Sequence, residues 1–342
     1  MPTYRFRLVN VFVGDTLQTD NALAGNPLCV FEDATGLADR QLMALARQFN
    51  LSETTFILPA PPSAPGEPAA IARVRIFTPT ADPALVEMRF AGHPTLGTAQ
   101  VLRALHGGDA VTLALPAGRV PVAADGDVWT LTAPFSGRPG VRPEPMPAAD
   151  VAAIVGLATD DLAGPPTWLD TGTEQLLVPL RSVAAVGRAR PSAARVDAWP
   201  RNPTGASNIY VFAFDRDAGG SDGRQRVRSR FFIRSPGTGN LYEDPGTGSA
   251  CANLGGWLLA NGHPLPARLA IDQGIEMQRP CRLLLDVGRD GTVRVGGRVA
   301  EIARGEALLQ AETALADDAA PAGDATLAGD APPSGDAARA GN

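Results

Sequence analysis

The sequence of 342 residues contains no lysine, so all 30 of its positively charged side chains are arginines. A Schiff base with pyridoxal phosphate and a phosphate-binding P-loop both require a lysine, and both are therefore excluded. No apolar run approaches the roughly 20 residues that cross a bilayer, and the N-terminal segment lacks the basic and apolar regions of a secretory signal. We therefore expect a cytoplasmic protein without a membrane partner.

Cysteine and histidine are also scarce, with three of each. Cys29, Cys251 and Cys281 lie far apart and form no CxxC pair, which argues against a disulfide framework and against a thiolate zinc site. We interpret these cysteines as small buried apolar residues. The histidines show no HExxH spacing, so the sequence predicts no metal site.

Negative charge is concentrated near the C-terminus. The net charge is −6, but residues 311–342 hold six acidic side chains and one arginine, which leaves about −1 for the rest of the chain. This segment consists almost entirely of Ala, Gly, Asp and Pro, and we predict that it is disordered. The nearly neutral remainder lacks the basic surface of a nucleic-acid-binding protein.

The alternation of apolar and turn residues predicts two α/β halves. Strand-like and helix-like patterns fill residues 1–135, and a stretch rich in Pro and Gly follows. A second set of patterns fills residues 136–290. Strands in residues 291–310 are candidates to complete the first half. We therefore expect an N-terminal domain, a C-terminal domain and a disordered tail.

In each half a strand, a loop and a glycine-rich turn precede an apolar helix. Arg230 follows Arg75 by 155 residues, and Gly246 follows Gly92 by 154 residues, which favours a duplicated domain. Unpaired N–H groups and the positive dipole end at such a helix start favour an anion, so two converging starts would suit a small carboxylate. The glycines could instead only permit close packing of helix and strand, and the pattern does not decide between the two.

Five polar residues near these turns are candidates for chemistry. Glu53 lies between a helix and an apolar strand, where partial desolvation would raise its pKa and make it a proton shuttle. His93 opens the first helix, and Asp244 precedes the second. Ser249 and Thr95 occupy matching places and could donate to a bound carboxylate. The alternatives are a surface glutamate and ordinary helix caps.

Six motifs extend in order along the chain before residue 311. They are GNPLCVF at 25–31, NLSETTFI at 50–57, RIFTP at 75–79, EMRFAGHPTLGTA at 87–99, YEDPGTGSA at 242–250 and QGIEMQRP at 273–280. Together they resemble the PhzF-like proteins of phenazine biosynthesis. An ordered set of six motifs is far more specific than any one of them.

The resemblance implies the diaminopimelate-epimerase-like fold, an α/β (α+β) architecture of two similar domains. Each domain wraps a mixed sheet around a central helix, and the active site lies between them. It further implies a cofactor-independent isomerase, commonly a homodimer, that moves a proton on a small carboxylated substrate, similar to trans-2,3-dihydro-3-hydroxyanthranilate isomerase. In this family Glu53 would be the proton shuttle. The positions that match the substrate pocket are Gly92, His93, Asp244, Ser249 and, less strongly, Asn26.

Two alternatives stay open. Related racemases of this fold use two cysteines, but the corresponding turns here hold Ala91 and the Asp244-Pro245 pair, and Cys251 lies farther along. A racemase or epimerase of amino or hydroxy acids would need a second acid/base opposite Glu53, for which Asp244 is the candidate. The third hypothesis is a non-catalytic binding protein that retains the fold and the pocket.

Overall fold

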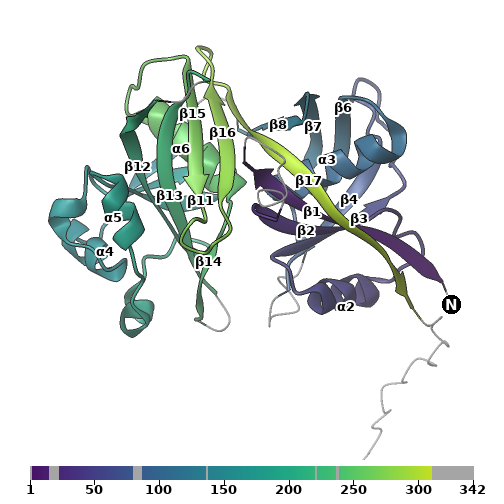
Figure 1. Cartoon of the computed structure of the whole chain (residues 1–342), viewed down its shortest axis with the longest axis horizontal. Helices are drawn as coiled ribbons and strands as arrows, with labels where there is room; N and C mark the ends of the chain where they lie inside the picture. Colours follow the sequence, from purple (N-terminus) through teal and green to yellow (C-terminus); the bar gives the residue numbers. More distant parts are fainter. Residues whose placement is uncertain are drawn as a thin grey trace, which may run out of the picture.

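The computed structural model describes residues 2–14, 23–79, 87–135, 138–219, 222–235 and 239–309. Two lobes lie side by side, and one long strand runs from one lobe across the other (Figure 1). The tail 311–342, predicted to be disordered, lies outside the described residues, as does the segment 136–137 at the predicted domain boundary. None of the helices in the described ranges combines the length and apolar character that crossing a membrane requires.

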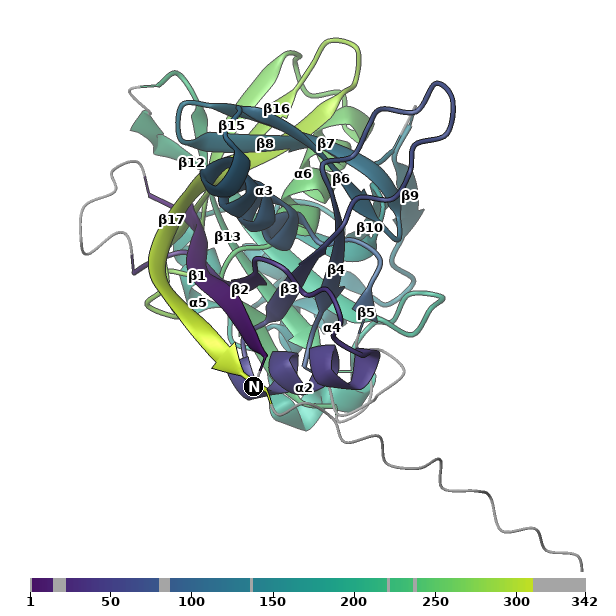
Figure 2. The same ribbon diagram turned by 90° about the vertical axis from the view of Figure 1, so that its right-hand side faces the viewer.

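The first lobe curves its strands around the helix α3 (Gly92–His106). The strands are β1 (Thr3–Val13), β2 (Asn26–Phe31), β3 (Glu53–Leu58), β4 (Ala72–Phe77), β5 (Glu87–Met88), β6 (Ala110–Leu115), β7 (Gly118–Asp125) and β8 (Val128–Thr132). The helix contacts β1, β2, β3, β6 and β8, which surround it in Figure 2. Ten of its fifteen residues are buried, which explains why apolar residues occur on all its faces. The helix α2 (Asp39–Phe49) covers the outer face at β3 and β4.

The second lobe repeats this plan around the helix α6 (Gly248–Ala260). Its strands are β9 (Gly140–Pro143), β10 (Thr167–Asp170), β11 (Glu174–Pro179), β12 (Ser207–Gly219), β13 (Gln225–Arg234), β14 (Leu241–Asp244), β15 (Ala267–Gln273) and β16 (Cys281–Val287). The helix packs on β10, β11 and β16. Two short helices, α4 (Ala148–Ile154) and α5 (Val183–Arg188), lie on the outer side of this lobe (Figure 1).

The long strand β17 (Val293–Leu308) joins the two lobes. Its first residues pair with β16 of the second lobe and with β8 of the first. It then pairs antiparallel with β1 along the whole of Thr3–Val13. Hydrogen bonding is therefore continuous from one lobe to the other, and the chain's last described strand lies beside its first.

Strand register reveals the duplication residue by residue. In the first lobe Phe77 lies opposite Thr54 on one side and Glu87 on the other. In the second lobe Phe232 lies in the same way between Ile209 and Glu243. Each lobe also has two parallel strand pairs at matching places, β2–β3 and β4–β6 against β11–β12 and β13–β15. The mixed sheets and the repeated plan confirm the predicted fold of two similar α+β units.

The helix starts correct one detail of the predicted duplication. The helices begin at Gly92 and Gly248, so Gly248 and not Gly246 is the counterpart of Gly92. Ser249 therefore matches His93 rather than Thr95. The Thr95 hydroxyl donates to the carbonyl of Ala91 at 2.7 Å, one turn back in its own helix. The proton of this hydroxyl is therefore used within the helix and is not donated to a ligand.

Candidate active site

The two central helices begin against each other. A Cβ placed on Gly92 would lie 3.3 Å from the Cα of Gly248, and a Cβ on Gly248 would lie 3.3 Å from the Cα of Gly92. The first N–H groups of each helix have no carbonyl acceptor within it, and both positive dipole ends point to this contact. The glycine turns thus allow close packing, and this packing brings the unpaired N–H groups of the two helix starts together.

A cavity of about 500 Å³ lies at this meeting point. Five of the six predicted site residues line it, and these are Glu53, Gly92, His93, Asp244 and Ser249. Three come from the first lobe and two from the second, so the cavity is a site between the lobes. Its volume is in the range of small-molecule sites.

The sixth predicted residue, Asn26, lies behind the cavity wall. It is fully buried, and its Nδ2 donates to Asp244 Oδ1 and to the carbonyl of Gly246, both at 2.9 Å. In this position Asn26 has no free face toward the cavity. It orients Asp244 from the other lobe instead of contacting a ligand itself.

Glu53 and His93 form the buried polar centre of the cavity. Glu53 is the first residue of β3, and burial raises the pKa of its carboxyl to about 7. Its Oε2 lies 3.3 Å from Nε2 of His93, and burial lowers the pKa of that imidazole to about 4, so the ring is neutral at pH 7. In the described part of the chain neither atom has a hydrogen-bond partner. Buried polar atoms rarely lack a hydrogen-bond partner, and two such atoms that face the same cavity are typical of a ligand site.

Asp244, the last residue of β14, differs from Glu53 because both of its oxygens have donors. Oδ1 accepts from Asn26 and Oδ2 accepts from the hydroxyl of Thr247. Burial raises the pKa of Asp244, while these hydrogen bonds act in the opposite direction. The carboxylate is therefore held in place as an acceptor, with a fixed orientation.

The three cysteines are buried, as their interpretation as small apolar residues predicted. Burial raises the pKa of each thiol, and none of the three lines the cavity. The thiol pair of the related racemases has no counterpart here. Among the described residues, no group of three His, Cys, Asp or Glu side chains is arranged to hold a metal ion.

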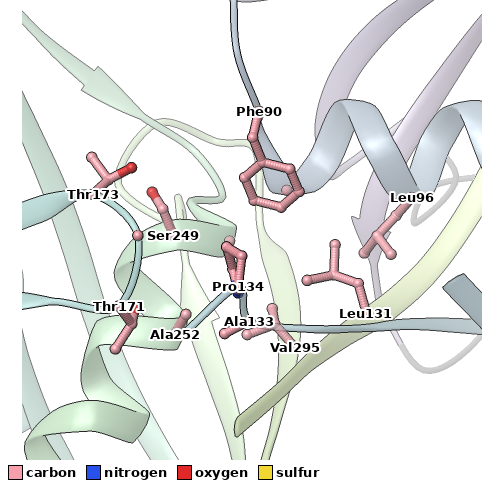
Figure 3. Close-up of a pocket in the computed structure, with 13 residues that line it drawn as sticks. Phe90, Leu96, Leu131, Ala133, Pro134, Thr171, Thr173, Ser249, Ala252 and Val295 are labelled. Atoms are coloured by element: carbon pink, nitrogen blue, oxygen red, sulfur yellow. The ribbon is translucent and has the colours of Figure 1, made fainter. Parts of the chain in front are cut away.

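A second, apolar cavity of about 20 Å³ adjoins the site (Figure 3). The two cavities share the lining residues Phe90, Gly92, Thr173, Gly248 and Ser249. The smaller one is otherwise enclosed by apolar side chains such as Leu96, Leu131 and Val295, which point inward from both lobes. It has room for about one methyl-sized group. The polar chemistry is therefore confined to the larger cavity.

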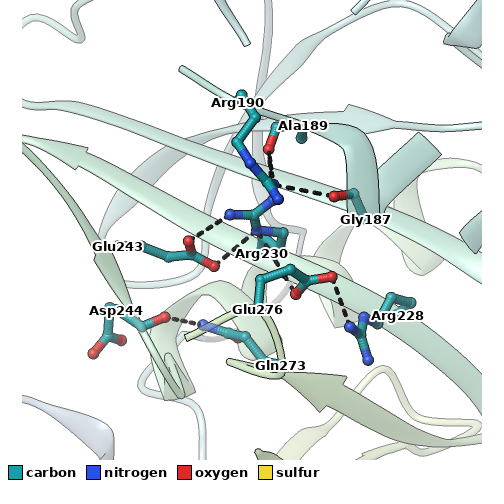
Figure 4. A network of polar contacts seen from close by, with 9 residues as sticks. All are labelled: Gly187, Ala189, Arg190, Arg228, Arg230, Glu243, Asp244, Gln273 and Glu276. Carbon is teal, nitrogen blue, oxygen red and sulfur yellow. Dashed lines mark hydrogen bonds and ion pairs between the residues drawn. The ribbon is translucent and has the colours of Figure 1, made fainter. Parts of the chain in front are cut away.

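An ion-pair network supports the strand that carries Asp244 (Figure 4). The guanidinium of Arg230 donates to both carboxylate oxygens of Glu243, the residue before Asp244, at 2.9 and 2.7 Å. Gln273 donates to the carbonyl of Asp244 at 2.9 Å, and Glu276 accepts from Arg228 at 2.7 Å. The strand that ends in Asp244 is thus fixed by its neighbours on both sides.

The first lobe repeats this ion pair at the matching position. Arg75 donates to both oxygens of Glu87 at 2.8 and 2.5 Å, and it also pairs with Asp39. The repeated pair is more exposed, because the Glu87 side chain is 31% exposed against 13% for Glu243. The same scaffold interaction therefore occurs twice, in two different dielectric environments.

Known proteins of this fold identify the family. Residues 17–305 match the family model described as phenazine biosynthesis-like protein. The chain belongs to the PhzF family. An uncharacterized isomerase of Pasteurella multocida is 35% identical over 304 residues, which cover 89% of this chain and 93% of the relative. The trans-2,3-dihydro-3-hydroxyanthranilate isomerase of Pseudomonas aeruginosa is 32% identical over 321 residues, which cover 90% and 100%. This PhzF-family chain is an isomerase.

Solved structures agree with this assignment. A PhzF-family phenazine biosynthesis protein of Bacillus anthracis has the same fold, with a TM-score of 0.73 at 20% identity, over 90% of this chain and 100% of the other. A Pseudomonas aeruginosa protein described as a predicted epimerase has a TM-score of 0.66 at 31% identity, with the same coverage. The predicted diaminopimelate-epimerase-like fold is confirmed.

Gln175, Asn208 and Tyr242 are among the residues of the cavity wall that sequence reasoning missed. The duplication was a usable signal for one of them. Strand register makes Thr54 the counterpart of Ile209, because each lies opposite the matching phenylalanine of the next strand. The residues that precede them, Glu53 and Asn208, are therefore counterparts as well. The spacing between Arg75 and Arg230, applied to Glu53, leads to the same residue.

Replacing Arg230 with methionine tests the buried ion pair beside Asp244. Arg230→Met leaves Glu243 buried without its cation, and we expect the free energy of unfolding to fall by about 3 kcal/mol. Arg75→Met is the matched control, with an expected loss of about 1 kcal/mol or less because its carboxylate partners are more exposed. Urea unfolding measures both values, and equal losses would contradict the assigned role of burial.

Glu53→Gln tests the raised pKa through stability. Wild type buries a neutral carboxyl below the ordinary pKa of about 4.5, and this favourable state is lost as pH rises through about 7. The glutamine variant does not titrate, so at pH 8 it should be more stable than wild type by about 3 kcal/mol, with no difference below pH 4.5. Glu67→Gln, at an exposed site, should show no such gain at pH 8. Chemical unfolding across pH decides, and a gain that does not vary with pH would refute the assignment.

Proposed function

We propose that this isomerase transfers a proton between two carbons of a small unsaturated carboxylate, with Glu53 as the proton shuttle and without a cofactor. The observation that carries the proposal is the buried Glu53 carboxyl in the cavity, whose Oε2 has no hydrogen-bond partner among the described residues and whose pKa is about 7. A group with that pKa exchanges its proton readily at neutral pH. Trans-2,3-dihydro-3-hydroxyanthranilate, the substrate in the relative's name, is the first compound to test.

The substrate carboxylate binds at the two helix starts. Backbone N–H groups at Gly92 and Gly248 and the hydroxyl of Ser249 are donors there, and both helix dipoles favour a negative charge. Asp244, an acceptor held in place, would repel a carboxylate. It therefore takes a hydroxyl or amino group of the substrate.

The proton transfer begins with ionised Glu53. The carboxylate accepts a proton from an activated carbon, and the electron pair left behind spreads over the conjugated system toward the substrate carboxylate. The helix-start N–H groups stabilise this charge. Glu53, whose proton exchanges with solvent, then delivers a proton to another carbon of the system, which moves the double bond. His93, neutral and 3.3 Å from Glu53, contributes hydrogen bonding without adding charge.

Two features favour this mechanism over a racemase with two acid/base groups. The counterpart of Glu53 in the second lobe is Asn208, which cannot exchange a proton at neutral pH. Both oxygens of Asp244, the other candidate, already accept hydrogen bonds. Of Glu53, Asn208 and Asp244, Glu53 is thus the group that is available to carry a proton.

The family resemblance supports one further part of the proposal, a homodimer, and we also propose a cytoplasmic location. The proposal includes neither a nucleic acid nor a membrane as a partner. Light scattering on the purified protein measures the dimer directly, and a monomer at micromolar concentration would refute that part alone.

Proton exchange in deuterated buffer tests the role of Glu53. Wild type should isomerise dihydro-hydroxyanthranilate and incorporate deuterium, whereas Glu53→Gln should lose at least about 10³-fold in turnover because no other group takes the proton. Proton NMR follows both processes, with Glu67→Gln as a control that retains full activity. Full turnover by Glu53→Gln would refute the mechanism, and scrambling at one carbon without double-bond migration would favour the racemase.

The pH dependence of kcat/KM provides an independent check. Because the ionised form of Glu53 starts the reaction, kcat/KM should rise with pH and level off above an apparent pKa of about 7. Initial rates between pH 5 and 9 define this profile. A flat profile over that range would contradict the assignment of Glu53 as the initiating base.

A further inference from the structure

A chain of buried amides leads from the backbone to Ser249. It starts at Asn253, which is fully buried one turn after Ser249 in α6. Asn253 Oδ1 accepts from the backbone N–H of Thr171 at 2.9 Å, and its Nδ2 donates to the carbonyl of Thr173 at 2.9 Å. A backbone N–H only donates and a carbonyl only accepts, so these two contacts fix which end of the Asn253 amide is oxygen.

This fixed orientation passes to Gln175. Nδ2 of Asn253 also donates to Oε1 of Gln175 at 2.9 Å, so the nitrogen end of the Gln175 amide faces Ser249. Gln175 Nε2 donates to Ser249 Oγ at 2.9 Å. Gln175 is 2% exposed. If its amide were turned over, its nitrogen would face the nitrogen of Asn253, and two donors would meet.

The Ser249 hydroxyl is therefore an acceptor on the side of Gln175. Its own proton must point elsewhere, and no acceptor for it occurs among the described residues. Ser249 lines the cavity, beside the start of α6. A hydroxyl whose proton is directed into a cavity matches a ligand atom that can only accept, as a carboxylate oxygen does.

We propose that Gln175 and Asn253 are positioning residues that fix the Ser249 hydroxyl as a donor, and that they thereby select a carboxylate over a carboxamide at this subsite. The substrate class rests on the proposed function, whereas the selection by the amide chain is new. A hydrogen bond from a neutral donor to a charged acceptor contributes more than one between neutral groups. The chain therefore acts on ligand preference and not only on packing.

Gln175→Glu reverses the last link of the chain without changing its shape. One carboxylate oxygen still accepts from Asn253, and the other now accepts the proton of Ser249, which turns the lone pairs of the hydroxyl toward the cavity. Gln175→Met has similar length and removes the link without offering a new acceptor. Each variant is made with Ser249 intact and in the Ser249→Ala background, so the cycle separates the effect through Ser249 from added charge or altered packing.

The probes are 3-hydroxyanthranilate and 3-hydroxyanthranilamide, which differ only in carboxylate against carboxamide. Calorimetry gives both Kd values, and their ratio is the readout. With Ser249 intact, we expect Gln175→Glu to lower the preference for the carboxylate at least about tenfold more than it does in the Ser249→Ala background. Gln175→Met should lower it by about threefold, and only with Ser249 intact.

The outcomes separate this inference from the proposed function. Equal losses in both backgrounds, or no preference for the carboxylate in wild type, would overturn the positioning role. If Gln175→Glu does not fold, as judged by its thermal unfolding, the Gln175→Met pair still decides the question. A wild type that prefers the carboxylate through Ser249 but neither isomerises nor exchanges protons on any compound would contradict the proposed function alone.

Discussion

The site depends on one contact, the backbone of Gly92 against the backbone of Gly248. A side chain at either position would hold the two helices apart and separate their unpaired N–H groups. Because the helices are the central elements of their lobes, this contact also sets how the lobes meet, and the cavity forms around it. The backbone contact thus brings the donors of both helix starts to the cavity, and the side chains around it are left free to provide the chemistry.

The duplicated scaffold presents unlike side chains at matching positions. Glu53 corresponds to Asn208, His93 to Ser249 and Met88 to Asp244. The carboxyl of Glu53, the proposed proton shuttle, therefore lies on one side of the cavity, and the hydroxyl of Ser249, the proposed donor, lies on the other. Symmetric backbone with asymmetric chemistry suits a reaction in which one group takes a proton and later delivers one, since a second acid/base would compete for the substrate.

The sequence predicted the central helices and the duplication, and five of the six site residues that it predicted line the cavity. These features could be predicted because glycine turns, apolar helices and ordered motifs are local signals. It did not predict that Asn26 faces Asp244, or that Gln175 and Asn253 lead to Ser249. These contacts join residues that are distant in the chain, and isolated Asn and Gln residues give no pattern of their own. Matching Gly92 to Gly246 failed because the second turn holds two glycines, Gly246 and Gly248, and the sequence pattern does not tell which of them begins the helix.

The pairing of β17 with β1 constrains the order in which the protein can be made. Residues up to Leu308 must leave the ribosome before β1 gains its second partner strand, although β1 precedes every other described strand in the chain. Domains made early in translation usually fold before the rest of the chain appears. Here the first lobe cannot be completed until β17 has been synthesised, and until then one edge of β1 has no partner strand. An unpaired strand edge can pair with a wrong strand. The strand that unites the two lobes thus also makes their folding interdependent in time.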